Sequence, residues 1–580
     1  MLKLIKDMQY SENNPFFSRL YLSPFFILFS AALLTPQLAL AQINNRNEDR
    51  FLQPNSEPPQ PLPAEETPAD PQMAPITEEA PNQTYRIETI NVIGSTIFTE
   101  EDFNSILKPL EGKTVTGEQL SEVVRGITRL YLEGGYLTSR AVLVEDSLET
   151  GMIEIRVLEG KLTRIDIEGT DRLNPRYIRS RLELASQPIL NTNRLEDQLR
   201  LLRLNPLIDT IEASLRAGEN IQESILAVRV QEANPLIAIA EFDNYSPPSV
   251  GSEEVTARVG YGNLSGIGDT ILASYSRTIQ GGAEEIDLSY TAPINAKNGT
   301  IQLRTNIGRN EVIEDEFKDL EIEGEFELFE ISYRQPFVRT PREEFALSLG
   351  FTYQKGETFL LGNPTPFTIG VEEDGVSRTS VIKFGQDYVK RSVSGAWALR
   401  SQFNIGTDIF EATENEGDAP DGQFVSWLGQ VQRVQILNEN NLLIIQADIQ
   451  LSSDPLLPSQ QFVIGGGQSV RGYRQNILAG DQGIRFSVED QITVSKNDAG
   501  EAILKIAPFV EAGAVINKEN NPNSIAQEQT VIAGLGVGLL WNPISNLNIR
   551  LDYGIPLVDL EDTGNNIQDD GLYFSLTYSK

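Results

Sequence analysis

The stretch Asn546-Leu-Asn-Ile-Arg-Leu-Asp-Tyr553 alternates apolar and polar residues. Successive side chains of a β-strand point to opposite faces, so one face of this stretch would be apolar and the other polar. Leu547, Ile549, Leu551 and Tyr553 form the apolar face, and Asn548, Arg550 and Asp552 the polar one. An arginine on the lipid face of a barrel costs about 2–4 kcal/mol at mid-bilayer, and a wet lumen avoids this cost. The stretch therefore predicts a strand of a membrane β-barrel with its charges inside. Segment 482–493 alternates in the same way and places Arg485, Glu489 and Gln491 inside.

The same alternation recurs in about sixteen segments between Leu236 and Lys580. They begin near residues 236, 255, 270, 285, 300, 326, 344, 379, 394, 424, 441, 482, 502, 530, 546 and 571. Connections after odd-numbered segments are mostly long and several are acidic, whereas those after even-numbered segments are short turns such as 542–545. Outer-membrane barrels have short periplasmic turns and long outer loops. A soluble β-sandwich or propeller, the alternative fold, would not explain the alternating lengths.

The composition argues against several other classes of protein. The 580-residue chain has no Cys and no His, which excludes disulfides, thiolate or imidazole metal sites and His-based triads. A net charge of −35 argues against nucleic-acid binding, which needs a basic surface. Mean hydropathy is −0.24 and no run of 18 apolar residues follows the N-terminal region, so a helical membrane protein is not expected. Without a phosphate loop, a nucleophile elbow or a carboxylate dyad, we expect no enzyme, no cofactor and no metal.

Residues 1–41 have the features of a secretory signal peptide. Lys3, Lys6 and Arg19 precede or flank an apolar run, and Ala39-Leu-Ala41 is a small-residue cleavage site. Residues 42–84 are a Pro-rich linker whose composition cannot build a packed core. A short helix over 42–53 could plug the barrel, or the whole segment could serve only as a tether.

Residues 85–160 and 161–234 share one plan, strand–helix–helix–strand–strand. The first unit should have a helix after Thr99, a second helix over 117–133, and strands at 139–144 and 152–158. The second unit should have strands at 163–168, 211–216 and 224–230, with one helix opened by Asn174-Pro175 and another over 193–203. Two tandem βααββ units indicate a repeat array. The expected fold class is thus α+β repeats followed by an all-β barrel over 235–580.

A Gly-rich segment, Phe462-Val-Ile-Gly-Gly-Gly-Gln-Ser-Val-Arg-Gly-Tyr-Arg474, lies in the long connection 452–481. Glycine allows tight backbone paths where other side chains would clash. The segment can therefore present Arg471 on a narrow tip. In a soluble protein it would be a candidate phosphate loop, but the barrel pattern on both sides argues against that role.

Several motifs occur together along the chain. The first unit contains Ile127-Thr-Arg-Leu-Tyr-Leu-Glu-Gly-Gly-Tyr-Leu-Thr-Ser-Arg140, and residues 151–160 read Gly-Met-Ile-Glu-Ile-Arg-Val-Leu-Glu-Gly. The barrel begins with Asp243-Asn-Tyr245, followed by Asn263-Leu-Ser-Gly-Ile-Gly-Asp269. With the Gly-rich loop, these motifs make residues 85–580 resemble the TpsB family, the outer-membrane transporters of two-partner secretion. The resemblance implies that the two repeat units are POTRA domains.

The resemblance also implies a gate. In the family, a loop with a V-R-G-Y tip folds back into the pore, and its arginine meets an acidic residue within an F-x-D-x-G motif of the inner wall. The corresponding residues here are Val470, Arg471, Gly472 and Tyr473 at the tip, and Phe509, Glu511 and Gly513 on the wall. Because Glu511 replaces the Asp, we expect a longer or differently angled contact; strand parity alone already places Glu511 in the lumen. We expect a solvated pair worth on the order of 1 kcal/mol, weak enough for a switch, with a latch that never moves as the alternative.

By resemblance, the barrel would export an unfolded partner protein from the periplasm to the surface of a Gram-negative-type bacterium. The expected partners are this secreted passenger, outer-membrane lipid and the barrel-assembly machinery, and no nucleic acid. The POTRA units would bind the passenger by β-augmentation, or would only hold the barrel in register. The predicted capture residues are Tyr131, Gly135, Tyr136 and Arg140. The alternatives are a barrel-insertion factor of the same superfamily and a passive porin or adhesin.

Overall fold

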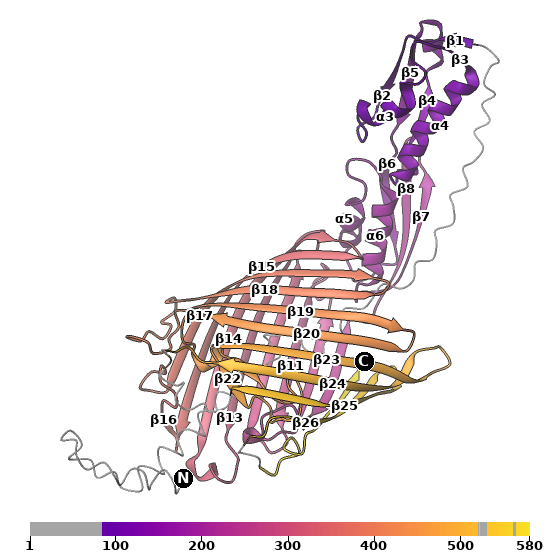
Figure 1. The fold of residues 1–580 in the computed structure, drawn as a ribbon. Coiled ribbons are helices and arrows are strands. Elements are labelled where there is room, and N and C mark those ends of the chain that lie inside the picture. Colours follow the sequence, from indigo (N-terminus) through magenta and orange to yellow (C-terminus); the bar gives the residue numbers. More distant parts are fainter. Residues whose placement is uncertain (1–83, 520, 522–529, 561–563) are drawn as a thin grey trace.

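The computed structural model describes residues 84–519, 521, 530–560 and 564–580. The predicted signal peptide (1–41) lies outside the described residues, as does the predicted linker with its possible plug helix (42–84) apart from Thr84, which begins a strand. The described chain forms two small α+β units in a row, followed by a barrel (Figure 1). No helix within these ranges is long and apolar enough to cross a membrane.

The first unit packs its helices against a three-stranded sheet. Its elements are β1 (Thr84–Arg86), β2 (Thr89–Ile93), α3 (Glu100–Leu107), β3 (Thr114–Thr116), α4 (Gly117–Glu133), β4 (Arg140–Leu143), η3 (Glu145–Glu149) and β5 (Met152–Leu158), with the sheet in the order β2-β5-β4. Capping boxes start both α-helices, Thr99 with Asp102 and Thr116 with Gln119. The predicted strand–helix–helix–strand–strand plan is confirmed, whereas the small β1–β3 pair was not predicted.

The second unit repeats the plan with its own apolar core. Its elements are β6 (Lys161–Glu168), α5 (Pro175–Glu183), α6 (Thr192–Arg203), β7 (Ile208–Ala217) and β8 (Glu223–Glu232), with the sheet in the order β6-β8-β7. The side chain of Asn174 accepts a hydrogen bond from Arg176 N and starts α5, with Pro175 in the first turn as predicted. Ile178 and Leu182 of α5 are fully buried in the core between helices and sheet.

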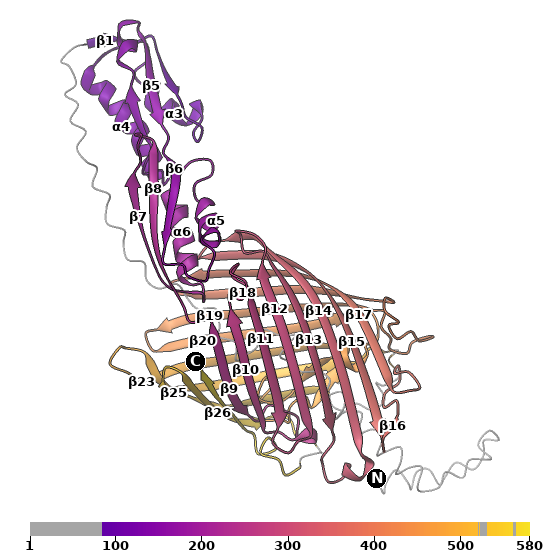
Figure 2. The same ribbon diagram turned by 180° about the vertical axis from the view of Figure 1, so that it is seen from behind.

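Sixteen long antiparallel strands of the described chain close into a barrel (Figures 1 and 2). They are β9 (Leu236–Asp243), β10 (Glu254–Gly262), β11 (Thr270–Thr278), β12 (Ala283–Pro293), β13 (Thr300–Glu311), β14 (Ile322–Arg339), β15 (Glu343–Leu360), β17 (Val376–Ser392), β18 (Gly395–Thr407), β19 (Val425–Asn438), β20 (Asn441–Ser452), β23 (Gln482–Lys496), β24 (Ala502–Ile516), β25 (Val531–Ile544), β26 (Leu547–Pro556) and β27 (Leu572–Ser579). Strand β27 pairs with β9 and closes the barrel. The connections contain η4 (Pro248–Val250), η5 (Lys318–Leu320), η6 (Pro458–Gln460), and the short strands β16 (Asn363–Pro364), β21 (Phe462–Ile464) and β22 (Leu478–Gly480).

The two faces of the barrel wall follow the predicted alternation. On β26, Leu551 and Tyr553 are each 47% exposed on the outer face, whereas Asp552 between them is fully buried. On β23, Ile484 and Phe486 are exposed, whereas Arg485 is buried. The barrel prediction is therefore confirmed in the number of long strands, in their closure and in the direction of their side chains.

Two joints position the α+β units on the barrel. Thr192 at the start of α6 donates its backbone and side-chain hydrogen bonds to the carbonyl of Gly135 in the first unit, both at 2.8 Å. The second joint connects the second unit to the barrel, where Asn174 N donates to the carbonyl of Gly266 in the β10–β11 turn at 2.9 Å. Arg181, stacked on the ring of Tyr177, donates to Asn298 in the β12–β13 turn at 3.2 Å. The units thus sit at the end of the barrel where the short turns lie (Figure 2).

Candidate functional site

The connection between β20 and β23, residues 453–481, lies inside the barrel. Its strands β21 and β22 pair with each other as a small antiparallel ribbon, and both also pack on β24. The apolar residues that join it to the wall form one buried cluster: Leu428, Phe462, Ile464, Val470, Tyr473, Leu478, Val515 and Ile532. Because Phe462, Ile464 and Val470 are at most 1% exposed, this inner loop is packed against the wall as closely as a protein core.

Glycines make the tight path of the inner loop possible. Gly465 and Gly466 have φ values of +115° and +90°, and Gly472 at the tip has φ +106°. A Cβ on Gly472 would lie 2.8 Å from Pro556 N of the wall. Only glycine adopts this conformation without strain, so the Gly-rich sequence brings the backbone of the tip against β26.

Arg471 at the tip is bound by three carboxylates of the inner wall. Its Nη2 lies 2.6 Å from Glu511 Oε1 on β24, and its Nη1 lies 2.9 Å from Asp552 Oδ1 on β26 and 3.1 Å from Glu489 Oε2 on β23. Its backbone N–H also donates to Glu511 Oε2 at 2.8 Å. The guanidinium lies over the ring of Phe509, 3.3 Å from its centroid. The predicted meeting of the tip with the F-x-E-x-G stretch is therefore present in the structure.

The expectation of a weak, solvated pair was wrong. The side chains of Arg471 and Glu511 are only 4% and 5% exposed. Removing one partner of a buried ion pair destabilises the folded state by about 3–5 kcal/mol, because the other charge is left uncompensated. The longer side chain of Glu511 does not lengthen the contact: its two oxygens bind the guanidinium and the backbone N–H together.

Sequence comparison with the family motif missed the other members of this cluster. Arg550 on β26 bridges Glu489 at 2.6 Å and Asp552 at 2.7 Å. Two arginines and three carboxylates thus form one network across β23, β24 and β26. The signal was available in the sequence, since the alternation of 482–493 and 546–553 had already placed Glu489, Arg550 and Asp552 in the lumen.

Further contacts fix the backbone on both sides of Arg471. The hydroxyl of Tyr573 on the closing strand β27 donates to Tyr473 O at 2.5 Å and accepts from Gly472 N at 2.9 Å. The hydroxyl of Tyr473 donates to Ala533 O on β25 at 2.7 Å. Arg474 binds Asp569 at 2.6 Å and Glu314 at 2.9 Å. The tip is therefore held by β27, by β25 and by two outer connections.

The remaining predicted wall and tip residues have packing roles. Val470 is fully buried in the apolar cluster. Gly513 faces the loop, and a Cβ there would lie 2.9 Å from the side chain of Ile464. Gly513 therefore lets β21 approach β24.

The predicted capture residues do not form one exposed surface. Tyr131 is fully buried in the first unit and donates to Glu159 at 2.8 Å; burial raises the pKa of Tyr131. Gly135 belongs to the joint with the second unit. Tyr136 is half-buried beside Tyr131, whereas Arg140 is exposed at the start of β4. Tyr131 is therefore a core residue of the first unit and is not accessible on its surface.

In the part of the chain that the structure describes, no cluster of three or more potential ligand side chains could hold a metal ion. The inner site is a constriction of the barrel lumen that is held closed by ion pairs between the loop and the wall.

Comparisons with known proteins agree with this architecture. The profile of the haemolysin secretion/activation protein family ShlB/FhaC/HecB matches residues 222–540, and that of the ShlB-type POTRA domain matches residues 85–160. The heme/hemopexin transporter protein HuxB of Haemophilus influenzae (strain 86-028NP) is 22% identical over 562 residues, covering 94% of this chain and 95% of HuxB. The outer membrane transporter CdiB of Dickeya dadantii is 22% identical over 407 residues, covering 69% of this chain and 71% of that protein.

Solved structures share the fold. CdiB from Escherichia coli superimposes with a TM-score of 0.71 at 19% identity, covering 97% of this chain and all of that one. BamA from Haemophilus ducreyi lacking POTRA domains 1–3 superimposes with a TM-score of 0.52 at 16% identity, covering 86% of this chain and all of that one.

Proposed function

Because the chain belongs to the haemolysin secretion/activation protein family ShlB/FhaC/HecB, whose members are outer-membrane transporters of two-partner secretion, we propose that it passes one unfolded exoprotein from the periplasm to the cell surface. One observation carries the mechanism: a loop anchored by Arg471 occupies the lumen of a closed barrel whose short-turn end bears two α+β units, the first of them matched by the POTRA profile. An extended polypeptide that crosses the membrane through the barrel would have to pass through the lumen that this loop occupies. The inner loop is therefore the gate, and its displacement is the opening step.

The Arg471 network is the latch of this gate. Three carboxylates on three strands converge on one guanidinium, so moving the tip away removes one positive charge from Glu511, Glu489 and Asp552, while Arg550 still pairs with Glu489 and Asp552. This charge imbalance favours return of the loop once the passenger has left. In the open state, water that enters the lumen lowers the cost of separating the charges, because it hydrates both sides. The latch thus closes the pore strongly in the resting state without making opening impossible.

The passenger would first meet the POTRA units. Within the residues that the structure describes, each sheet has two edge strands: β2 and β4 in the first unit, and β6 and β7 in the second. Strand β7 is ten residues long and largely exposed, and it starts at Ile208 near the barrel. An extended segment can add to such an edge through backbone hydrogen bonds with little demand on its sequence. We place capture on this edge and on exposed Arg140, in place of buried Tyr131.

Secretion of the cognate exoprotein tests the gate. Cells would carry either the native chain, Arg471→Ala, or Arg258→Ala as the matched control, since Arg258 also faces the lumen but pairs with Glu241 at 3.9 Å, away from the tip. We expect Arg471→Ala to reduce secretion sharply, because the loop no longer returns to its closed position after each passenger. Barrel levels in the outer membrane should be unchanged, and Arg258→Ala should secrete normally. Native secretion by Arg471→Ala would refute the role of the latch.

A barrel-insertion factor remains the second candidate, because BamA from Haemophilus ducreyi shares the fold. The two candidates differ in what the POTRA units bind. Pull-down with the full chain in detergent should recover a large exported protein if the chain secretes, and nascent barrel proteins if it assembles them. We expect the barrel-assembly machinery to insert this chain into the outer membrane under either function.

A further inference from the structure

The outer face of strands β11 to β15 changes from apolar to charged at one level of the barrel. On β14, Phe329, Ile331, Tyr333 and Phe337 are exposed outward, and Glu327 and Glu325 follow toward the outer loops. The apolar stretch from Phe329 to Phe337 matches the roughly 9–11 residues that a tilted strand needs to cross a bilayer. The charged level therefore coincides with the lipid headgroups of the cell-surface leaflet.

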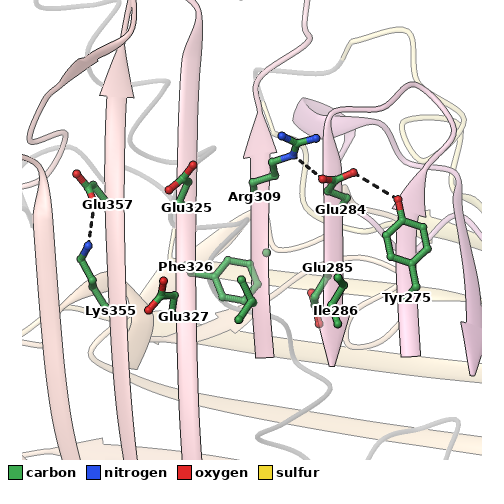
Figure 3. Close-up of a pocket in the computed structure, with 12 residues that line it drawn as sticks. Tyr275, Glu284, Glu285, Ile286, Arg309, Glu325, Phe326, Glu327, Lys355 and Glu357 are labelled. Carbon is green, nitrogen blue, oxygen red and sulfur yellow. Dashed lines mark hydrogen bonds and ion pairs between the residues drawn. The ribbon is translucent and has the colours of Figure 1, made fainter. Parts of the chain in front are cut away.

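A cleft of about 240 Å³ lies at this charged level (Figure 3). Glu284, Arg309, Glu325 and Glu357 are direct cross-strand neighbours on four consecutive strands. Arg309 Nε lies 2.5 Å from Glu284, and Lys355 Nζ lies 2.9 Å from Glu357. The side chain of Arg309 remains 70% exposed, so its other N–H groups are accessible to a ligand. The cleft thus offers cationic donors and carboxylates side by side.

An apolar groove of about 780 Å³ lies on the same strands, one row of residues closer to mid-membrane. It is lined mainly by Ile271, Leu288, Tyr290, Leu303, Phe329, Ile331, Phe351, Tyr353 and Phe410. The short side chain of Thr305 lies between Leu288 and Phe329 in the strand register and leaves space there. The groove therefore begins directly below the charged cleft.

Phe410 of the β18–β19 connection forms one side of the groove. Its ring lies 5.8 Å from Phe351 and 6.2 Å from Tyr353, both on the outer face of β15. Phe410 and Glu411 have φ values of +57° and +56°, in the left-handed region that residues other than glycine adopt only under strain. An outer loop thus adopts a strained conformation and places an exposed aromatic ring against the lipid-facing wall.

We propose that this wall binds one phosphorylated lipid of the cell-surface leaflet, with an acyl chain in the groove and the headgroup in the charged cleft. Arg309 and Lys355 donate hydrogen bonds to a phosphate. Glu325 and Glu327 carry negative charge toward the same headgroup, so a divalent cation must accompany it; such cations bind carboxylate and phosphate oxygens together. Because apolar and charged cavities are stacked at the right depth, the chemistry selects an amphiphile in place of a free anion.

Native mass spectrometry of the full chain in detergent tests this proposal. The probes are lipid A with Mg²⁺, lipid A with a chelator, and phosphatidylglycerol, a phospholipid of the opposite leaflet. The first variant combines Arg309→Glu with Lys355→Glu, and the second, Thr305→Trp, fills the groove while keeping the charges. Arg433→Glu is the matched control, because Arg433 also lies on the outer wall, beside Trp397 near the short-turn end.

The native chain and Arg433→Glu should retain lipid A in the presence of Mg²⁺, and both test variants should bind it about tenfold more weakly. The chelator should weaken binding by the native chain. Equal retention by native chain and variants would overturn the site, and equal binding of phosphatidylglycerol would overturn its assignment to the cell-surface leaflet. If the charge variant fails to fold, as judged by its circular dichroism, Thr305→Trp decides alone.

Discussion

Two groups of lumen-facing charges in the barrel use the same residue types differently. Around the loop tip, on β23, β24 and β26, the charges are buried: Arg471 and Glu511 are 4% and 5% exposed. Across the lumen, on β12 to β17, the pairs are more open: Arg304 with Asp287 at 20% and 17%, and Lys383 with Glu330 at 32% and 19%. The first region we call the latch wall and the second the open wall.

The difference between the two walls lies in hydration. Pairs in contact with water are screened and add about 0–1 kcal/mol, whereas removing one partner of a buried pair costs about 3–5 kcal/mol. The tip of the inner loop excludes water from the latch wall, so the loop itself creates the strong interaction that holds it. Once the tip leaves, the latch wall becomes chemically similar to the open wall. The strength of the latch is thus a property of the closed state.

The largest effect is expected from Arg471→Ala. It leaves Glu511, Glu489 and Asp552 short of one positive charge and should destabilise the docked loop by about 3–5 kcal/mol. In planar bilayers, we expect the purified barrel to show frequent, long-lived open conductance levels. Arg304→Ala on the open wall is the comparison and should leave the closed fraction unchanged. Equal conductance traces for these two variants would contradict the claim that the latch wall, and not the open wall, holds the loop closed.

Glu511→Asp should have an intermediate effect. The shorter side chain retracts its carboxylate by one methylene, so it cannot bind the guanidinium and the backbone N–H of Arg471 as Glu511 does. We expect a loss of about 1–3 kcal/mol, the range for an impaired buried hydrogen bond. A double-mutant cycle with Arg471→Lys in the same conductance assay measures the coupling. Glu330→Asp, on the open wall, is the control, and a coupling near zero for Glu511 would contradict the latch.

Much of this fold was predictable because local pattern and final environment agree. The alternation in 546–553 located β26 and assigned Arg550 and Asp552 to the lumen, since the lipid and the lumen impose opposite polarity on adjacent residues. The helices that follow Thr99 and Asn174 in the repeat units were equally predictable from the sequence, because these two residues have side chains that cap a helix.

Other features depended on contacts between distant segments. Burial of the Arg471 pair follows from packing of β21 and β22 on the wall, which no local pattern encodes. The arginine–carboxylate network joins residues on three strands, and the sequence gives the face of each residue but not the neighbours across the loop. The motif at 127–140 suggested passenger binding, but Tyr131 is a core residue and Gly135 a joint between the units. A motif alone does not distinguish a binding surface from a folding requirement.

Tyr573→Phe tests whether neutral hydrogen bonds contribute to the latch. The change removes the hydroxyl that donates to Tyr473 O and accepts from Gly472 N, leaving two backbone groups of the tip without it. We expect a cost of about 1–3 kcal/mol and brief openings in the conductance assay. Tyr290→Phe is the matched control, since its hydroxyl binds Asp269 at 2.9 Å outside the lumen. If the Tyr573→Phe barrel opens no more often than the native one, the strength of the latch comes from its charges alone.

The smallest effect is expected on the open wall, from Lys383→Met. Its partner Glu330 lies 2.7 Å away in a hydrated part of the lumen, and Thr352 also donates a hydrogen bond to Glu330 at 2.8 Å. Because Glu330 keeps this donor and contact with water, the barrel should lose about 0–1 kcal/mol of stability. The small shift in unfolding temperature should shrink further as salt is raised from 0.05 M to about 1 M, since the Debye length falls to about 3 Å. A loss as large as that of Arg471→Ala would mean that the open wall excludes water as well, and burial by the loop would no longer explain the strength of the latch.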